Sequence, residues 1–201
     1  MTNRTKGTAG VEQLEYITLD ARRGLDLEDD LALAAQNDVA AFESLYVRHR
    51  SAVYRYLRTR TTNGDDAADL TALTFERALV AIERYRPGGA GVRAWLFGIA
   101  RNASIDHGRR LRAVPAPDRP PDSDEGPEAR LVADEAAAEL RQRVAALPPD
   151  QRDAIVLRFA AGLNATEIGA VLGKTEAASQ KLVSRGLAVL KEAYCVCSTG
   201  R

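Results

Sequence analysis

A proline-rich acidic stretch divides this chain and limits how it can fold. Five prolines and four acidic residues stand between Val114 and Pro127: Pro115, Pro117, Pro120, Pro121, Pro127, Asp118, Asp122, Asp124 and Glu125. Proline lacks a backbone N–H and disrupts helix interiors, and such a run of charges cannot build an apolar core. We therefore predict a flexible, extended linker over 113–127, with polyproline character, between two helical units.

The segment before the linker has the periodicity of helices. One stripe at helical spacing consists of Phe42, Leu45, Tyr46, His49, Val53 and Leu57. A second stripe runs over 70–82, and a third helix follows a Pro-Gly-Gly loop. Asn63-Gly64 is predicted to end the first helix, so that Asp65 or Asp66 caps the second. Three helices with short connections predict a compact domain over 29–112.

The segment after the linker, over 128–194, also predicts helices. Pro149 suits the first turn of one of them. Asn164 with Glu167 three residues later is the pattern of a capping box, and Gly173 can end that short helix before a longer one. This order indicates a helix-turn-helix. The predicted fold class is all-α: two small helical domains joined by a flexible acidic Pro-rich linker.

Composition restricts the class of protein. The chain has 201 residues and a formal net charge of zero, with 28 basic and 28 acidic side chains. No apolar run approaches the roughly 18–20 residues of a membrane span. The polar segment over 1–28, predicted to be a mostly disordered arm, lacks the apolar core of a secretory signal. We therefore predict a cytoplasmic protein without membrane insertion.

Residues that would indicate catalysis or a cofactor are not found. The sequence has no phosphate loop, nucleophile elbow or cluster of metal ligands. Its two cysteines, Cys195 and Cys197, lie together in a tail over 195–201 and are predicted to stay reduced. We predict no metal, no cofactor and no enzymatic activity.

The stretch from Arg86 to Arg112 combines a basic glycine-rich loop with an amphipathic helix. An apolar back, a polar front and an arginine-rich end suit an element that packs on a helical core and holds a phosphate backbone. The alternative is an ordinary core helix with solvated arginines. For Trp95 a place in the core is favoured, because a large indole on an apolar stripe usually packs.

The exposed face of the predicted helix-turn-helix offers side chains that can read bases. Gln can form two hydrogen bonds with the edge of adenine, whereas Lys and Arg read guanine or hold phosphates. The candidate positions are Lys174, Thr175, Glu176, Ala178, Gln180, Lys181, Ser184 and Arg185. The alternative is a helical hairpin with solvated polar residues. Because the net charge is zero, we expect the chain to bind DNA poorly alone and to need a larger partner.

Several stretches together resemble a bacterial alternative sigma factor of the extracytoplasmic-function (ECF) group, over about 30–194. They are Asp69-Leu-Thr-Ala-Leu-Thr-Phe-Glu-Arg-Ala78, Trp95-Leu-Phe-Gly-Ile-Ala-Arg-Asn-Ala-Ser-Ile-Asp106, Leu147-Pro-Pro-Asp-Gln-Arg-Asp-Ala-Ile-Val-Leu-Arg158 and Gly162-Leu-Asn-Ala-Thr-Glu-Ile-Gly-Ala-Val-Leu-Gly173. The first resembles the acidic-start helix of sigma domain two and the second its promoter −10 helix. The last two resemble the start of sigma domain four. Their order, with an acidic linker in the middle, makes the resemblance specific.

The resemblance implies a protein that binds core RNA polymerase, recognises a promoter and starts transcription. Sigma domain two would dock on the clamp of the largest polymerase subunit through Asp66, Asp69, Thr74 and Arg77. It would hold the melted −10 strand, with one base flipped into a pocket, through Arg86, Arg93, Arg101, Asn102, Asp106, Arg109 and Arg110. Sigma domain four would read the −35 element through the eight positions above and contact the flap of the second-largest subunit. An anti-sigma protein is implied as a further partner.

Departures from the family pattern affect the expected contacts. Ala72 and Leu73 stand where Gln and an acidic residue are common, and Leu182 stands where a basic residue usually lies. The clamp contact is therefore expected to be less polar and the −35 contacts weaker or shifted. Two other classes of protein fit the helical pattern. A stand-alone helix-turn-helix regulator would bind duplex DNA tightly without polymerase, and a helical adaptor would sequester a partner without touching DNA.

Overall fold

The structure is a computed structural model that describes residues 27–113 and 139–198, with side chains described over 27–111 and 139–192. The predicted arm, except its last two residues, and almost all of the predicted linker therefore lie outside the described residues. Within the two described ranges every regular element is a helix, which confirms the predicted all-α class.

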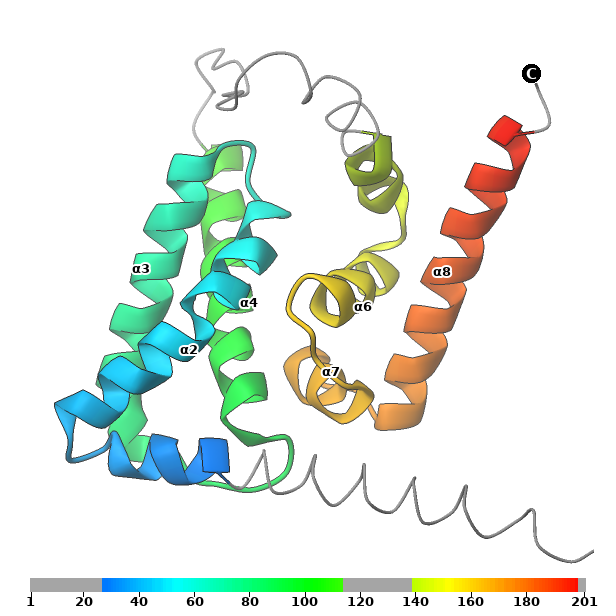
Figure 1. Ribbon diagram of the computed structural model, residues 1–201. Helices are drawn as coiled ribbons and strands as arrows, with labels where there is room; N and C mark the ends of the chain where they lie inside the picture. The colour runs from blue at the N-terminus through cyan, green and yellow to red at the C-terminus, as the bar shows by residue number, and fades with distance from the viewer. Residues whose placement is uncertain (1–26, 114–138, 199–201) are drawn as a thin grey trace, which may run out of the picture.

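The first lobe is built on three long helices. They are α2 (Val39–Arg58), α3 (Gly64–Ala81) and α4 (Gly91–Ala113). A short helix over 27–34 precedes them, and one 3-10 turn, η1 (Ile82–Arg84), follows α3. Figure 1 shows the long helices side by side, with the short first helix below their lower ends. Each long helix turns an apolar stripe toward the others, and these stripes form the core of the lobe.

Short polar side chains determine where the first two long helices begin. Asp38 caps α2, because its carboxylate accepts a hydrogen bond from Ala40 N at 2.8 Å. Asn63 caps α3 and accepts from Asp66 N at 2.7 Å. The predicted cap at Asp65 or Asp66 is therefore wrong. Both residues lie in the first turn instead, where their negative charges stabilise the helix by interacting with the positive end of its dipole.

The short helix over 27–34 crosses the predicted boundary between arm and domain, which fell after residue 28. Ala32 and Ala35 share a buried cluster with Leu45 and Tyr85, so this segment belongs to the core of the first lobe. The apolar periodicity of the sequence begins only at residue 31. The polar first turn of the helix gave no such signal.

The second lobe consists of four helices among the described residues. A helix over 139–146 is followed by α6 (Pro149–Phe159), α7 (Ala165–Leu172) and α8 (Glu176–Ser198). In Figure 1, α8 is the longest helix of this lobe and extends well beyond α7. Across the described part of the chain, no helix is both long and apolar enough to cross a membrane.

The local signals that predicted the second lobe are confirmed. Pro149 occupies the first turn of α6. At the start of α7, Asn164 Oδ1 accepts from Glu167 N at 2.9 Å and Glu167 Oε2 accepts from Asn164 N at 2.6 Å, which is the predicted capping box. Gly173 ends α7 with a φ of 66°, a left-handed conformation that favours glycine.

The helix-turn-helix depends on one close backbone approach. A Cβ atom added at Gly169 of α7 would lie 2.6 Å from the carbonyl oxygen of Lys174 and 3.3 Å from Ser179 Oγ. Ser179 has no exposed surface, and its hydroxyl donates to the carbonyl oxygen of Thr175 at 3.1 Å. Only glycine at position 169 therefore permits this crossing of α7 and α8.

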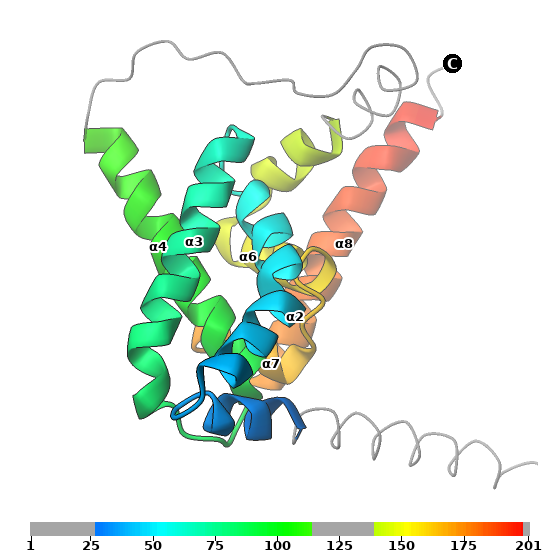
Figure 2. The ribbon, with the colours of Figure 1, turned by 60° about the vertical axis from the view of Figure 1, so that its left-hand side comes forward.

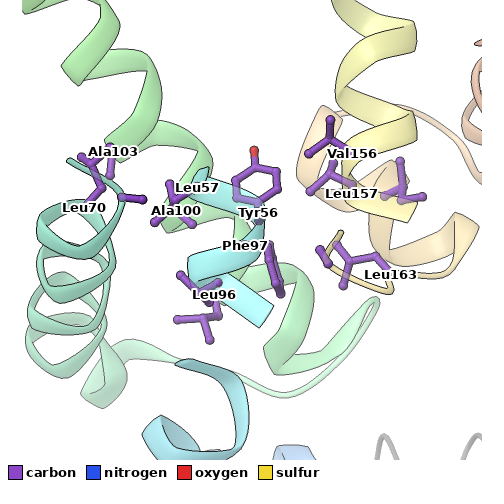
Figure 3. Close-up of a cluster of buried hydrophobic side chains, with 14 of the residues drawn as sticks. Tyr56, Leu57, Leu70, Leu96, Phe97, Ala100, Ala103, Val156, Leu157 and Leu163 are labelled. Atoms are coloured by element: carbon purple, nitrogen blue, oxygen red, sulfur yellow. The ribbon is translucent and has the colours of Figure 1, made fainter. Parts of the chain in front are cut away.

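The two lobes pack against each other through a continuous apolar core. Tyr56 and Phe97 of the first lobe share one buried cluster with Leu157 and Leu163 of the second. Figure 3 shows Tyr56 and Phe97 between the other first-lobe side chains and the side on which Leu157 and Leu163 lie. Helices α4 and α7 are in contact, and Figure 2 also shows α7 close to the lower part of α4. The sequence predicted two units but gave no sign that they share a core.

Candidate nucleic-acid interface

The glycine loop, residues 86–91 at the start of α4, has a backbone conformation that favours glycine at three positions. Gly88, Gly89 and Gly91 have φ values of 137°, 66° and 74°. A Cβ atom at Gly88 or Gly89 would meet no other atom within 4 Å, so conformation rather than crowding requires glycine there. The loop therefore leaves open space beside it.

That space is a cavity of about 460 Å³ between the loop and the first turns of α4. Arg86 and Asn102, both predicted to contact the −10 strand, line it and are exposed. Trp95 lines it as well, and its ring lies 5.2 Å from that of Tyr85. The indole is half-buried and packs on the core with its remaining surface at the cavity. Ala170 of α7 also lines the cavity, which places the second lobe at its edge.

Two other residues of the predicted −10 set face the second lobe. The Arg93 guanidinium donates to the carbonyl oxygens of Gly162 at 2.8 Å and Ala161 at 3.3 Å. Its Nη1 lies 3.5 Å from Glu167 Oε1, and the Glu167 side chain is only 1% exposed. The guanidinium group of Arg93 is therefore bound by two carbonyl oxygens and one carboxylate of the second lobe.

Arg101 is held in the same way. Its Nε donates to Asp153 Oδ2 at 3.2 Å, and the other oxygen of Asp153 accepts from Arg60 Nη2 at 2.5 Å. Asp153 lies on α6, whereas both arginines belong to the first lobe. One carboxylate of the second lobe thus pairs with two guanidinium groups of the first.

The remaining −10 candidates lie at the far end of α4. Asp106 and Arg110 line a smaller cavity of about 180 Å³ between α3 and α4, together with Asp66, Asp69 and Arg77 of the predicted polymerase-binding set. In this cavity Arg77 Nη1 lies 3.4 Å from Asp106 Oδ2. Asp106 is therefore grouped with the α3 residues rather than with Asn102. The side chain of Arg109 is exposed nearby on α4.

Thr74, predicted to contact polymerase, is not on the surface. It has no exposed area, and its Oγ1 donates to the carbonyl oxygen of Leu70 at 2.7 Å. Residues 67, 70, 71, 74, 75 and 78 form the buried side of α3, so the helical period places Thr74 inward. Thr74 is therefore not available for the predicted contact with polymerase. Leu73, one residue earlier, lines the cavity instead.

The eight predicted −35 residues lie together at the first turns of α8 and the turn before it. Most are exposed, while Lys174 and Ala178 are half-buried. Thr175 Oγ1 accepts from Ala178 N at 3.2 Å and so caps the helix. Lys174 Nζ lies 2.9 Å from Asp150 Oδ2 within the same lobe. Exposed polar side chains continue along one side with Gln180, Lys181, Ser184 and Arg185.

Two residues that contact the ends of the glycine loop, Asp29 and Gln36, were not predicted from the sequence. Asp29 Oδ1 accepts hydrogen bonds from Tyr85 Oη at 2.6 Å and from Val92 N at 2.8 Å. Gln36 Nε2 donates to the carbonyl oxygen of Tyr85 at 2.8 Å. These contacts join the short first helix to both ends of the glycine loop. The acidic Glu-Asp-Asp run before residue 31 was the only available signal, and it does not indicate a distant partner.

A histidine and a carboxyl group are buried together near Arg93. His49 Nε2 lies 3.9 Å from Glu28 Oε2. Burial, with the charges of Arg93 and Arg48, lowers the pKa of His49 to about 4. Burial raises the pKa of Glu28, although the same two arginines oppose that shift. The imidazole is therefore neutral at neutral pH.

These features define a two-lobed helical protein with a cavity of about 460 Å³ beside the glycine loop and a helix-turn-helix in the second lobe. The family models agree with that description: Sigma-70 region 2 matches residues 45–114, and Sigma-70 region 4 matches residues 137–190. The chain belongs to the sigma-70 family of RNA polymerase sigma factors, within the ECF group.

Individual relatives and solved structures agree with this assignment. The chain is 35% identical over 162 residues to the ECF RNA polymerase sigma factor BldN of Streptomyces coelicolor, covering 78% of this chain but only 61% of BldN. It is 32% identical over 171 residues to the ECF sigma factor ShbA of Streptomyces griseus, covering 79% of this chain and 90% of ShbA.

Among solved structures, CnrH in complex with the cytosolic domain of CnrY is similar, with a TM-score of 0.65 and 26% identity over 84% of this chain and 97% of CnrH. The sigma factor RpoE of Bartonella quintana, in complex with the anti-sigma factor NepR, has the same fold at 22% identity, with a TM-score of 0.58 over 77% of this chain and 97% of that one.

Proposed function

We propose that this chain binds core RNA polymerase and directs it to promoters with −10 and −35 elements. Three surfaces on one chain support the proposal: the cavity beside the glycine loop, the polar side of α8, and the charged cavity between α3 and α4. The first of these carries the most weight. A stand-alone regulator that reads duplex DNA needs the helix-turn-helix but has no use for a cavity that fits a single base.

The cavity beside the glycine loop suits one unstacked base of the melted −10 strand. Its volume of about 460 Å³ lies within the usual range of small-molecule sites. Asn102 offers both a donor and an acceptor to the edge of a base, and Arg86 offers a charge to a phosphate. Trp95 supplies an aromatic surface on which a base can stack. Extracting a base from the duplex costs a few kcal/mol. A preformed cavity that binds the base offsets part of this cost, so polymerase must supply less of the free energy of extraction.

The start of α8 suits the major groove at the −35 element. Helix α7 supports it from behind through the close contact at Gly169, and Gln180 faces outward where it can read a base edge. Lys181 and Arg185 lie four residues apart on the same side of the helix, so that both can reach one phosphate backbone. Leu182 is half-buried and takes no part in this surface.

Polymerase contacts are assigned to the remaining charged surfaces. Asp66, Asp69 and Arg77 are proposed to dock on the clamp of the largest subunit, and the second lobe on the flap of the second-largest. RpoE binds the anti-sigma factor NepR. By analogy we propose an anti-sigma protein for this chain, which would cover the same surfaces when transcription is off.

In the conformation described here, part of the −10 surface is covered. Arg93 and Arg101 contact the second lobe, and Ala170 stands at the edge of the cavity. We propose that this is a closed state of the free chain and that polymerase separates the lobes, which makes both arginines available to DNA. The zero net charge supports this view, since a chain with little electrostatic affinity for DNA depends on polymerase for it.

Reconstituted transcription tests the proposal. Core polymerase with the full chain is expected to produce defined transcripts from genomic DNA, and mapping their starts would give the promoter sequence. Lys181→Ala should weaken use of promoters that depend on the −35 element. Lys191→Ala removes the same charge from an exposed position ten residues further along α8 and serves as the matched control. Tight binding of duplex DNA by the free chain, without promoter-dependent transcripts, would favour a stand-alone regulator instead.

A further inference from the structure

We propose that Asp29, in the short first helix, is a positioning residue that holds the glycine loop in the shape that receives the −10 strand. The inference rests on the function proposed for the cavity beside that loop. It extends that function to a residue that lies outside both the loop and the helix α4.

One carboxylate oxygen of Asp29 connects the two ends of the loop. Asp29 Oδ1 accepts a hydrogen bond from Tyr85 Oη at 2.6 Å, directly before the loop, and from Val92 N at 2.8 Å, directly after it. Charged acceptors make the shorter and stronger hydrogen bonds in proteins. The two ends of the loop over 86–91 are therefore fixed to the same atom.

Helix α4 depends on this outside carboxylate at its N-terminus. The first turn of α4 contains no acidic residue. The residue before the helix, Ala90, has no side-chain acceptor for the first unpaired N–H groups. Asp29 supplies both the acceptor and the negative charge that a helix N-terminus favours. Its role in α4 is that of a cap contributed by another helix.

The other hydrogen bond of Asp29 orients a wall of the cavity. Tyr85 lines the cavity, and its ring lies 5.2 Å from that of Trp95. Gln36 Nε2 holds the backbone of Tyr85 at 2.8 Å, so the short first helix and the turn after it hold this residue at two points. Burial and the hydrogen bond to Asp29 raise the pKa of Tyr85, which keeps its hydroxyl protonated as a donor.

Holding the ends matters because the loop between them is intrinsically flexible. Gly88, Gly89 and Gly91 each have a positive φ, and glycine loses more conformational entropy on ordering than any other residue. A loop that is free to sample other shapes must be ordered at the moment the strand binds, which weakens binding. Asp29 therefore contributes to strand affinity without touching the strand.

The test uses holoenzyme reconstituted from core polymerase and the full chain. The probe is a fluorescent single-stranded oligonucleotide with the non-template −10 sequence of a promoter mapped with the wild type. Asp29→Ala removes the acceptor, whereas Asp29→Asn keeps an acceptor oxygen without the charge. Asp30→Ala is the matched control, because this exposed neighbour carries the same charge. Tyr85→Phe removes only the hydroxyl partner.

We expect Asp29→Ala to weaken strand binding about 10-fold or more, from the loss of charge-assisted hydrogen bonds. Asp29→Asn should recover part of that loss, and Asp30→Ala should stay within about 2-fold of the wild type, since it has no part in the loop. Combining Asp29→Ala with Tyr85→Phe should cost less than the sum of the two single changes. Affinity for core polymerase and for a −35 duplex should be unchanged, and a purely structural role would not give that separation.

Two results would overturn the inference while leaving the proposed function intact. In one, Asp29→Ala binds the strand as tightly as Asp30→Ala. In the other, it lowers affinity for core polymerase, −35 duplex and −10 strand by the same factor, which indicates a general loss of folding. A wild-type holoenzyme that fails to retain the strand at all would instead refute the proposed function, and the role of Asp29 with it.

Discussion

Replacing Asp153 by Asn is expected to open the two lobes of the free chain. Both carboxylate oxygens of Asp153 are used across the lobe boundary, one by Arg60 at 2.5 Å and the other by Arg101 at 3.2 Å. Asn has nearly the same size and keeps one oxygen, so packing is preserved. What is lost is the negative charge that two guanidinium groups face.

The burial of the three side chains determines how much free energy the closed form is expected to lose. Asp153 is 13% exposed, Arg60 17% and Arg101 27%. Breaking a fully buried ion pair costs about 3–5 kcal/mol, because it leaves an uncompensated charge. Water reaches part of this group, so we reduce the figure to about 2 kcal/mol. At about 1.4 kcal/mol per factor of ten, the equilibrium between closed and open forms shifts about 30-fold toward the open form.

Two measurements on the free chain check this prediction. Amide hydrogen exchange should become faster where α4 and α7 meet, since that contact is lost on opening. Affinity for a single-stranded −10 oligonucleotide should rise by up to about 30-fold, in proportion to the open fraction. The affinity of the holoenzyme should change little, because polymerase is proposed to separate the lobes already.

Asp150→Asn is the matched control for this experiment. Asp150 lies on the same helix, is 57% exposed, and pairs with Lys174 inside the second lobe rather than across the boundary. It should leave both measurements unchanged. The reasoning is refuted if Asp150→Asn has the same effect as Asp153→Asn, or if Asp153→Asn alters neither exchange nor affinity.

Three further predictions concern glycine, pH and salt. Gly169→Ala should destabilise the second lobe by about 2 kcal/mol in chemical denaturation, because its Cβ would meet a backbone oxygen at 2.6 Å; Gly98→Ala, where a Cβ meets nothing within 4 Å, should instead stabilise α4 by up to about 1 kcal/mol. His49 has a pKa of about 4 in the folded chain against 6.5 as its ordinary value, so the unfolded chain takes up its proton first as pH falls. The free energy of unfolding should therefore decrease as pH falls from 6.5 to about 4, by at most about 1.4 kcal/mol per pH unit from this residue. His49→Gln should remove this contribution to the pH dependence. A variant with the same pH profile as the wild type would contradict the assignment to His49. Finally, Lys181→Ala should reduce the salt dependence of −35 duplex binding by the holoenzyme, by about one in the slope of log K against log salt, whereas an equal reduction for Lys191→Ala would contradict the assigned surface.

The sequence allowed prediction of features whose partners are close along the chain. The capping box at Asn164 and Glu167, the helix end at Gly173 and the helix start at Pro149 are all set by residues within one turn of one another. Such signals do not depend on how distant elements pack. The all-α class and the helix-turn-helix followed from them, and the ordered motifs identified the family.

Contacts between residues far apart in the chain were not predictable in the same way. Glu167 was recognised as part of a cap, yet its other oxygen lies 3.5 Å from Arg93 of the opposite lobe. Asp29 was given no role from the sequence, and its partners stand 56 and 63 residues further on. The surface position predicted for Thr74 was wrong for another reason. A motif names residue types in order, but only the packing of α3 determines which of them face inward.

The backbone contact at Gly169 also bears on how promoter preference can change in evolution. The angle between α7 and α8 is fixed by the buried Gly169 and by main-chain atoms of the turn, not by the exposed side chains of α8. Outward-facing positions such as Gln180 and Ser184 can therefore be exchanged without altering that angle. Mutation can diversify the set of genes controlled by such a factor one side chain at a time, while the geometry of docking in the groove is inherited unchanged.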